Sequence, residues 1–128
     1  MIILIIRTDK PEAEIGLYND KDQLAYEIWQ AHRELAETLN RKITNLLQGR
    51  TLQEVGGIVV YQGPGSYTGL RIGMSVANAL AYSLDCSIAA VSGENWLDKG
   101  IQQIMANQGS AIVLPQYDAP ARTTTPRK

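Results

Sequence analysis

The residues with the clearest chemical potential form a glycine-rich run between two apolar segments. The run Gly63-Pro64-Gly65-Ser66-Tyr67-Thr68-Gly69 follows the apolar stretch 57–61 and precedes a second apolar stretch, 70–84. Glycine permits positive φ angles and close backbone approach, and the start of a helix presents unpaired N–H groups. Such a turn either holds an anion such as a phosphate or lets a helix and a strand pack closely. Because the run matches neither the Walker A pattern nor GxGxxG, both interpretations stay open.

The other reactive side chains give little support for catalysis. Ser66 and Thr68 carry hydroxyl groups but have no adjacent base, and His32 is the only histidine of the chain, so a nucleophilic triad lacks its parts. One histidine and one cysteine, far apart in sequence, also argue against a catalytic metal site. We therefore expect His32 to lie on the surface where a helix begins, and Cys86 to be a buried structural thiol.

Small residues recur along the stretch that follows the glycine run. Gly69, Gly73 and Ala77 are spaced four residues apart, which places them on one face of a helix. A glycine inside a helix costs roughly 1 kcal/mol relative to alanine, so this face should have a packing role. It either packs closely on the sheet of the chain itself or forms a seam for a partner helix.

The hydrophobic pattern predicts the elements that would position these residues. Apolar and alternating runs predict strands at 2–6, 14–18, 23–29, 58–61, 87–91 and 110–114. Helical spacing predicts helices at 31–48, 70–84 and 93–107, the last capped by Ser92, and a short helical turn at 52–56. The order β-β-β-α-β-α-β-α-β contains repeated β-α-β crossovers, so we expect an α/β fold with helices packed on a mixed sheet.

Composition limits the classes of protein that fit. The chain has 128 residues, of which 45% are hydrophobic and 20% charged, values typical of one soluble domain with a core. A net charge of −1 argues against strong non-specific nucleic-acid binding. A single cysteine suits a reducing cytosol, and no apolar run reaches the ~20 residues of a membrane span. The start lacks the features of a signal peptide, and we expect the Pro- and Thr-rich residues 115–128 to form an extended or disordered tail.

The segment from Gly63 to Gly73 resembles the signature GPGSFTGLRIG of the TsaB (YeaZ) family, with Tyr67 in place of phenylalanine. The residues 4–8 (LIIRT) resemble the LAIDT strand of that family, and His32 with the leucines after it resembles its first long helix. The resemblance covers most of residues 1–114. It implies a single lobe of the actin-like ATPase (ASKHA, RNase H-like) superfamily at 1–114, followed by the tail.

The resemblance implies a cytoplasmic, non-catalytic scaffold rather than an enzyme. TsaB proteins bind TsaD, which transfers a threonylcarbamoyl group to adenosine 37 of tRNA (t6A), and TsaE is the third component. A helical bundle would join this chain to TsaD, or to a second copy when TsaD is absent, with tRNA involved only indirectly. We expect no cofactor on the chain alone, and ATP or ADP only at the interface of the complex. A phosphate-binding module or an enzyme that uses the Gly63–Gly69 turn is the alternative.

The same resemblance assigns residues to these roles. We expect neither catalytic residues nor metal ligands. The residues expected at the partner interface are Leu35, Leu39, Ile43, Leu46, Gly69, Arg71, Gly73, Ala77 and Leu80. The signature residues of the turn are Gly63, Pro64, Gly65, Ser66, Thr68 and Gly69.

Two features depart from the family pattern. Arg7 stands where the family has an aspartate; from the residues alone, this cation either binds an anion or pairs with Asp9 or Glu94. A cation there repels metal ions, so we expect no ATP hydrolysis. The chain is also about half as long as full-length family members, which have two lobes of ordinary size. Since residues 115–120 and the basic end resemble the C-terminus of those members, we expect a natural short form that lacks the second lobe.

Overall fold

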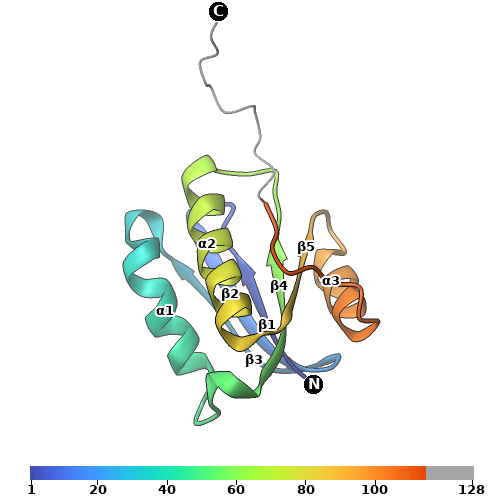
Figure 1. Cartoon of the computed structure of the whole chain (residues 1–128). Coiled ribbons are helices and arrows are strands. Elements are labelled where there is room, and N and C mark those ends of the chain that lie inside the picture. The colour runs from blue at the N-terminus through green and yellow to red at the C-terminus, as the bar shows by residue number, and fades with distance from the viewer. Residues whose placement is uncertain (115–128) are drawn as a thin grey trace, which may run out of the picture.

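A five-stranded sheet forms the centre of the computed structural model, which describes residues 1–114 (Figure 1). The strand order is β3-β2-β1-β4-β5. Neighbouring strands are antiparallel from β3 to β1 and parallel from β1 to β5. This arrangement confirms the predicted mixed sheet. The strands are β1 (Ile2–Arg7), β2 (Glu12–Asn19), β3 (Asp22–Gln30), β4 (Val55–Tyr61) and β5 (Ser87–Val91).

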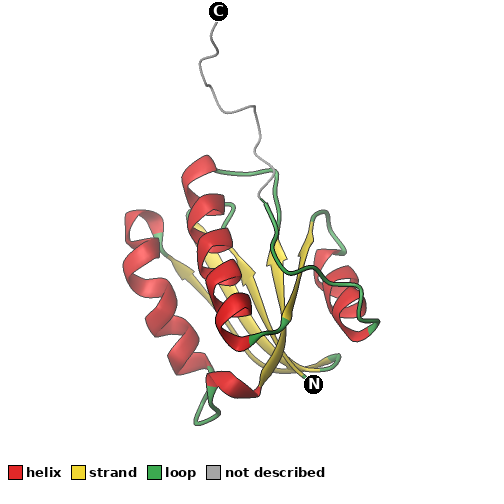
Figure 2. Ribbon diagram, viewed as in Figure 1, coloured by secondary structure: helices red, strands yellow, loops and turns green. Residues whose placement is uncertain are grey.

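Helices cover both faces of the sheet (Figure 2). Two of them, α1 (Leu35–Leu46) and α2 (Tyr67–Leu84), lie on one face, and α3 (Trp96–Met105) lies on the other. The central strand β1 is apolar on both sides because it faces a helix layer on each: Leu4 and Ile6 join the core under α1 and α2, whereas Ile3 and Ile5 join the core under α3. None of the helices in the described part of the chain is long and apolar enough to cross a bilayer.

The predicted boundaries differ from the structure mainly where turns begin. A 3₁₀ turn, η1 (His32–Glu34), takes the place of the predicted first turn of α1. The short helical turn predicted at 52–56 is present as the 3₁₀ turn η2 (Leu52–Glu54), and β4 begins directly after it. The helix α2 begins three residues earlier than predicted, because the hydroxyl of Ser66 accepts a hydrogen bond from the backbone of Gly69 and caps the helix. The predicted cap Ser92 is wrong, since α3 begins at Trp96.

The predicted strand at 110–114 is also wrong. Only Ser110 pairs with the sheet, through an isolated bridge to Ile88. The backbone N–H and C=O of Val113 bind the side-chain amide of Asn78 on α2, at 3.0 and 2.9 Å. Because one side chain satisfies both backbone groups, this segment packs beside α2 without pairing as a strand. The predicted tail, 115–128, lies outside the described residues.

Candidate functional site

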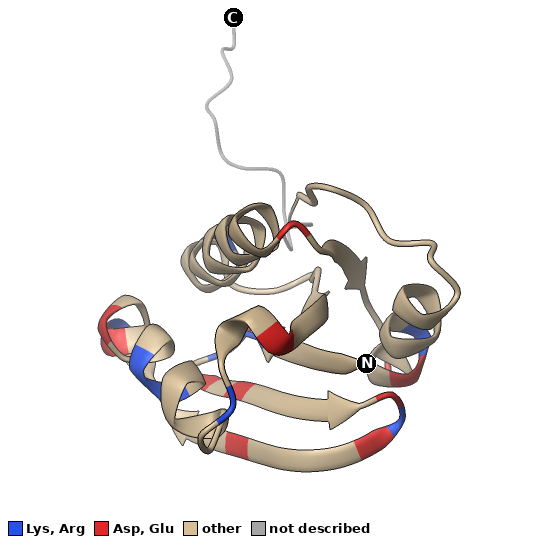
Figure 3. Cartoon of the chain, turned by 60° about the horizontal axis from the view of Figure 1, so that its bottom comes forward, with Lys and Arg blue, Asp and Glu red and all other residues tan. Residues whose placement is uncertain are grey.

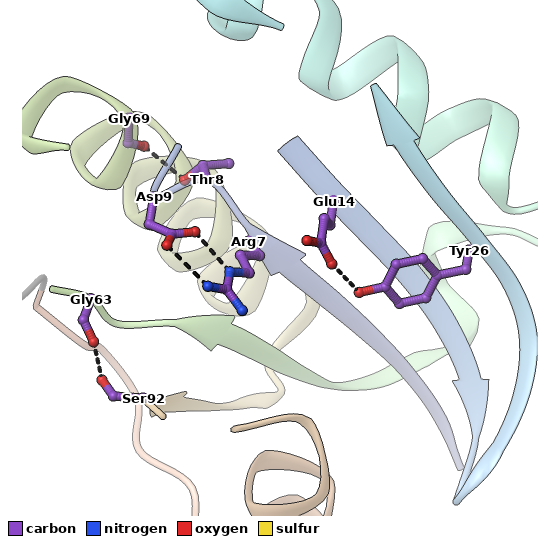
Figure 4. A network of polar contacts seen from close by, with 8 residues as sticks. All are labelled: Arg7, Thr8, Asp9, Glu14, Tyr26, Gly63, Gly69 and Ser92. Atoms are coloured by element: carbon purple, nitrogen blue, oxygen red, sulfur yellow. Dashed lines mark hydrogen bonds and ion pairs between the residues drawn. The ribbon is translucent and has the colours of Figure 1, made fainter. Parts of the chain in front are cut away.

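The glycine turn packs directly on the loop that follows β1 (Figure 4). The backbone N–H of Ser66 donates to the carbonyl of Asp9 at 3.0 Å, and the hydroxyl of Thr8 donates to the carbonyl of Gly69 at 2.7 Å. An anion at the start of α2 would need free backbone N–H groups there, and the N–H of Ser66 is already bound to Asp9. These contacts hold the turn and the first turn of α2 against the chain's own sheet.

Three glycines of the turn and of α2 have no room for a side chain. A Cβ atom would lie 2.4 Å from the Cβ of Asp9 at Gly65, 2.2 Å from the carbonyl oxygen of Thr8 at Gly69, and 2.1 Å from the Thr8 hydroxyl oxygen at Gly73. Such distances lie well inside van der Waals contact. Close packing within the chain therefore explains these glycines, which favours the packing interpretation of the run over a phosphate cradle.

The opposite end of the turn is bound to the end of β5. The hydroxyl of Ser92 donates to the carbonyl of Gly63, and the backbone N–H of Gln62 donates to the carbonyl of Val91 at 2.7 Å. Gly63 has a φ of 117°, a conformation that strongly favours glycine. The turn is thus held from both sides, by the loop after β1 and by the end of β5.

Arg7 closes β1 beside this turn and forms an ion pair. Its Nε and Nη2 atoms donate to the two carboxylate oxygens of Asp9, at 2.8 and 3.1 Å (Figure 4). The guanidinium carbon also lies 3.9 Å from the ring centroid of Tyr61 and 5.5 Å from that of Trp96. Burial lowers the pKa of Arg7, but the hydrogen bond and charge of Asp9 outweigh it and raise that pKa overall. The partner of Arg7 is therefore Asp9 rather than Glu94.

Most of the residues expected at the partner interface lie in the core. Leu80 is half-buried, Gly69 is covered by Thr8, and Arg71 is exposed, with its guanidinium carbon 5.4 Å from the ring centroid of Tyr67. The other six are buried in the chain's own core and expose little of their surface, although Leu35 among them lines the hollow that also contains His32. These six are Leu35, Leu39, Ile43, Leu46, Gly73 and Ala77.

The surface between α1 and α2 is formed by other residues. Two adjoining open hollows, of about 330 and 390 Å³, lie there and share Ser75 and Val76. We call this surface the α1–α2 groove. Sequence reasoning missed most of it because the helical period marks the core-facing side, whereas the groove consists of small and medium-sized residues on the flanks. Its lining residues are Ala36, Asn40, Thr68, Arg71, Ile72, Ser75, Val76, Ala79, Leu80 and Ser83.

Of the side chains considered for reactivity, His32 lines an open hollow together with Ser66 and Thr68 of the turn, whereas Cys86 lies between α2 and β5. His32 is exposed, as predicted, and has a φ of 47° at the entry to α1. Cys86 is half-buried rather than fully buried. Burial, and then the negative charge of Asp85, raise the pKa of its thiol, which disfavours the nucleophilic thiolate. Within residues 1–114, no three His, Cys, Asp or Glu side chains gather into a group that could hold a metal ion.

The expectation that Cys86 is unreactive leads to a prediction. Iodoacetamide at pH 8 should alkylate Cys86 of the folded chain more slowly than the same cysteine in urea, because the raised pKa and partial burial reduce both the thiolate fraction and access. Mass spectrometry of timed samples measures the two rates. Equal rates would show that burial does not protect this thiol.

The sheet order, with two helices on one face and one on the other, defines the class of protein: a single RNase H-like lobe of the actin-like (ASKHA) type. Thermus thermophilus RuvC in complex with a Holliday junction has this fold at a TM-score of 0.55 and 9% identity, over 94% of this chain and 84% of that one. YeaZ from Pseudomonas aeruginosa superimposes at a TM-score of 0.66 and 29% identity, over 71% of this chain and 43% of that chain.

A family model described as "TsaD: tRNA N6-adenosine threonylcarbamoyltransferase" matches residues 29–117. The TsaB of Bacillus subtilis, a tRNA threonylcarbamoyladenosine biosynthesis protein, is 37% identical over 93% of this chain. A tRNA N6-adenosine threonylcarbamoyltransferase of Geotalea uraniireducens is 44% identical, over 48% of this chain and 19% of its own length. The chain belongs to the family that this model describes, and within it to the TsaB (YeaZ) proteins. It spans about half of the curated TsaB relative from B. subtilis, 51% of its length.

Proposed function

We propose that this chain is a non-catalytic subunit in the biosynthesis of threonylcarbamoyladenosine in tRNA, and that it acts by binding TsaD. The observation that carries the proposal is the relation to TsaB proteins over 93% of the chain. The packing of the glycine turn supports a structural role over an enzymatic one, because the turn's glycines face the chain's own backbone. The chain would act in the cytoplasm.

The α1–α2 groove is the proposed binding surface. Ala36, Ser75 and Ala79 are small and exposed, so a helix of the partner can approach both helices closely. The half-buried Val76 and Leu80 supply apolar area at its centre, which suits the core of a protein interface. Of the residues first expected at the interface, only Arg71 and Leu80 line this groove.

Further parts of the proposal concern the other components. TsaE would join the complex after TsaD, and tRNA would contact the chain only indirectly. Without TsaD, the α1–α2 groove would bind a second copy of the chain. The chain alone would bind no cofactor, and any ATP or ADP would lie at the joint interface.

Ala79→Arg tests the surface. A long charged side chain in the groove should weaken binding to TsaD by on the order of tenfold or more, whereas stability should hardly change because Ala79 is exposed. Ala106→Arg, at an exposed position just after α3, is the matched control and should bind normally. Calorimetric titration with TsaD of the same organism, together with a t6A assay of the reconstituted components, provides the measurement.

The outcomes separate the two parts of the proposal. If the unchanged chain fails to bind TsaD and adds nothing to t6A formation, the proposed function is wrong. If it binds and Ala79→Arg binds equally well, the function stands and the groove is the wrong surface.

A further inference from the structure

An open hollow lies at the entry to α1, where the loop after β1 and the start of α2 also meet. Its volume is about 270 Å³. It adjoins the α1–α2 groove, because Thr68 and Ile72 line both. We call it the basic hollow, since Lys10, His32 and Arg33 line it and no acidic residue of the described chain does. Its other lining residues are Pro11, Ala31, Leu35, Ser66, Thr68, Gly69 and Ile72.

Backbone contacts hold the basic residues around this hollow. The N–H groups of Ala31 and His32 both donate to the carbonyl of Pro11, at 2.9 and 3.2 Å. Because Lys10 precedes Pro11 and Arg33 follows His32, these two bonds bring both charged residues to the same place. Two segments that are distant in sequence therefore build one basic site.

The cations of the basic hollow have no acidic partner among residues 1–114. Neither Lys10 nor Arg33 forms an ion pair there, and both are exposed. Of the neighbouring carboxylates, that of Asp9 is paired with Arg7, and Glu34 does not line the hollow. Since the whole chain has a net charge of −1, this local excess of positive charge does not follow from composition. It favours an anionic occupant.

Charge is distributed unevenly along the groove. The helix α2 has Arg71 as its sole charged residue and is tan over most of its length in Figure 3, where Lys and Arg are blue and Asp and Glu red. Arg71 lines the half of the groove that adjoins the basic hollow, whereas the described lining residues of the other half are all uncharged. A partner that lies along the groove therefore meets positive charge at one end only.

We propose that the basic hollow binds acidic side chains of TsaD, at one end of the TsaD segment that lies in the groove. The inference rests on the proposed function, because the groove is the surface proposed to bind TsaD. Carboxylates suit the hollow, since Lys10 and Arg33 donate charge-assisted hydrogen bonds, and the hydroxyls of Ser66 and Thr68 can add neutral ones. Pairing at this end fixes the direction of the TsaD segment, because the reverse direction would place its carboxylates beside uncharged residues.

A nucleic acid is the less suitable anion for this surface. Its phosphates are spread along a backbone, so a protein that binds it needs basic side chains along a path. The basic side chains gather at one end of the groove, and the other end offers the half-buried Val76 and Leu80 instead. This combination of an apolar centre and a charged rim is typical of a protein interface.

Charge reversal tests the basic hollow. Lys10→Glu combined with Arg33→Glu should raise the dissociation constant for TsaD by at least about tenfold at low ionic strength. The difference from the unchanged chain should shrink at high ionic strength, because salt screens exposed charges. Lys21→Glu combined with Lys99→Glu is the control: it changes the net charge equally, at exposed positions outside the hollow and the groove, and should bind TsaD normally. Calorimetric titration at two salt concentrations is the measurement.

The outcomes separate this inference from the proposed function. If the unchanged chain does not bind TsaD, both are wrong. If it binds and the charge-reversed chain binds equally well, or if the control is weakened as much, only the inference is wrong. If TsaD binding is unchanged but the complex with the charge-reversed chain binds tRNA less tightly, the hollow holds a phosphate backbone, which also overturns the inference.

Chemical cross-linking of the complex identifies the occupant. A carbodiimide activates a carboxylate, and an amine that lies against it then forms an amide. The complex should therefore yield a peptide that joins Lys10 to an Asp or Glu of TsaD, detected by mass spectrometry after digestion. Lys10→Arg keeps the charge but has no reactive amine, so this product should disappear. Absence of any product between Lys10 and TsaD, in a complex that otherwise cross-links, would contradict the proposal.

Discussion

Gly73→Ala is expected to lower the free energy of unfolding by about 2–3 kcal/mol, although alanine is the better helix former by roughly 1 kcal/mol. The added Cβ atom would lie 2.1 Å from the Thr8 hydroxyl oxygen and 3.2 Å from both its Cβ and its methyl carbon. To relieve this overlap, α2 must move away from the loop after β1, which disrupts the hydrogen bond between Thr8 and Gly69. Urea unfolding followed by circular dichroism measures the change.

A second substitution separates this steric effect from other causes. Thr8→Ala removes the hydroxyl oxygen, which is the nearest atom, and the methyl carbon, so Gly73→Ala combined with Thr8→Ala should be less destabilised than the sum of the two single variants. Ser75→Ala, at an exposed position of the same helix, is the control for helix propensity and should be neutral or slightly stabilising. Strict additivity would mean that Gly73 and Thr8 are not in the close contact described.

The local pattern of the chain was sufficient to predict most of the sheet. Ile2–Ile6 and Ser87–Val91 are short apolar runs whose strand character depends only on their own residues, and the predicted ranges nearly match β1 and β5. The segment 110–114 looked similar but is not a strand. Its backbone binds Asn78, which is distant in sequence, and local periodicity contains no information about such a partner.

The candidate site shows the same limit. The spacing of Gly69, Gly73 and Ala77 predicted one closely packed helix face. It did not tell what packs there, because the chain's own sheet and a helix of a partner protein both require small residues for close approach. The structure shows that Thr8 covers the first two, and that Ala77 is fully buried. The groove residues on the flanks of α1 and α2 have no distinctive sequence pattern, so only the packing of the two helices identifies them.

Arg7→Leu is expected to lower the free energy of unfolding by about 2 kcal/mol, which is less than the 3–5 kcal/mol typical of breaking a fully buried pair. The side chain of Asp9 is only 8% exposed and would keep a charge without its partner, whereas that of Arg7 is 20% exposed, so water partly screens the pair. The contact with the ring of Tyr61 at 3.9 Å would also be lost, a contribution of about 0.5–1 kcal/mol at partly exposed sites. Urea unfolding at neutral pH is the measurement.

The double variant Arg7→Leu with Asp9→Asn tells which part dominates. Asparagine removes the unpaired charge at nearly constant shape, so most of the lost stability should return if the carboxylate is the main cost. Arg33→Leu, at an exposed position with no ion pair in the described chain, is the control and should change stability little. If the double variant stays as unstable as Arg7→Leu, the stacking of Arg7 on Tyr61 carries the effect. In both cases the guanidinium of Arg7 already pairs with the carboxylate of Asp9 beside the turn. Another cation could bind Asp9 only by displacing Arg7, which would lose the ion pair and the contact of Arg7 with the ring of Tyr61.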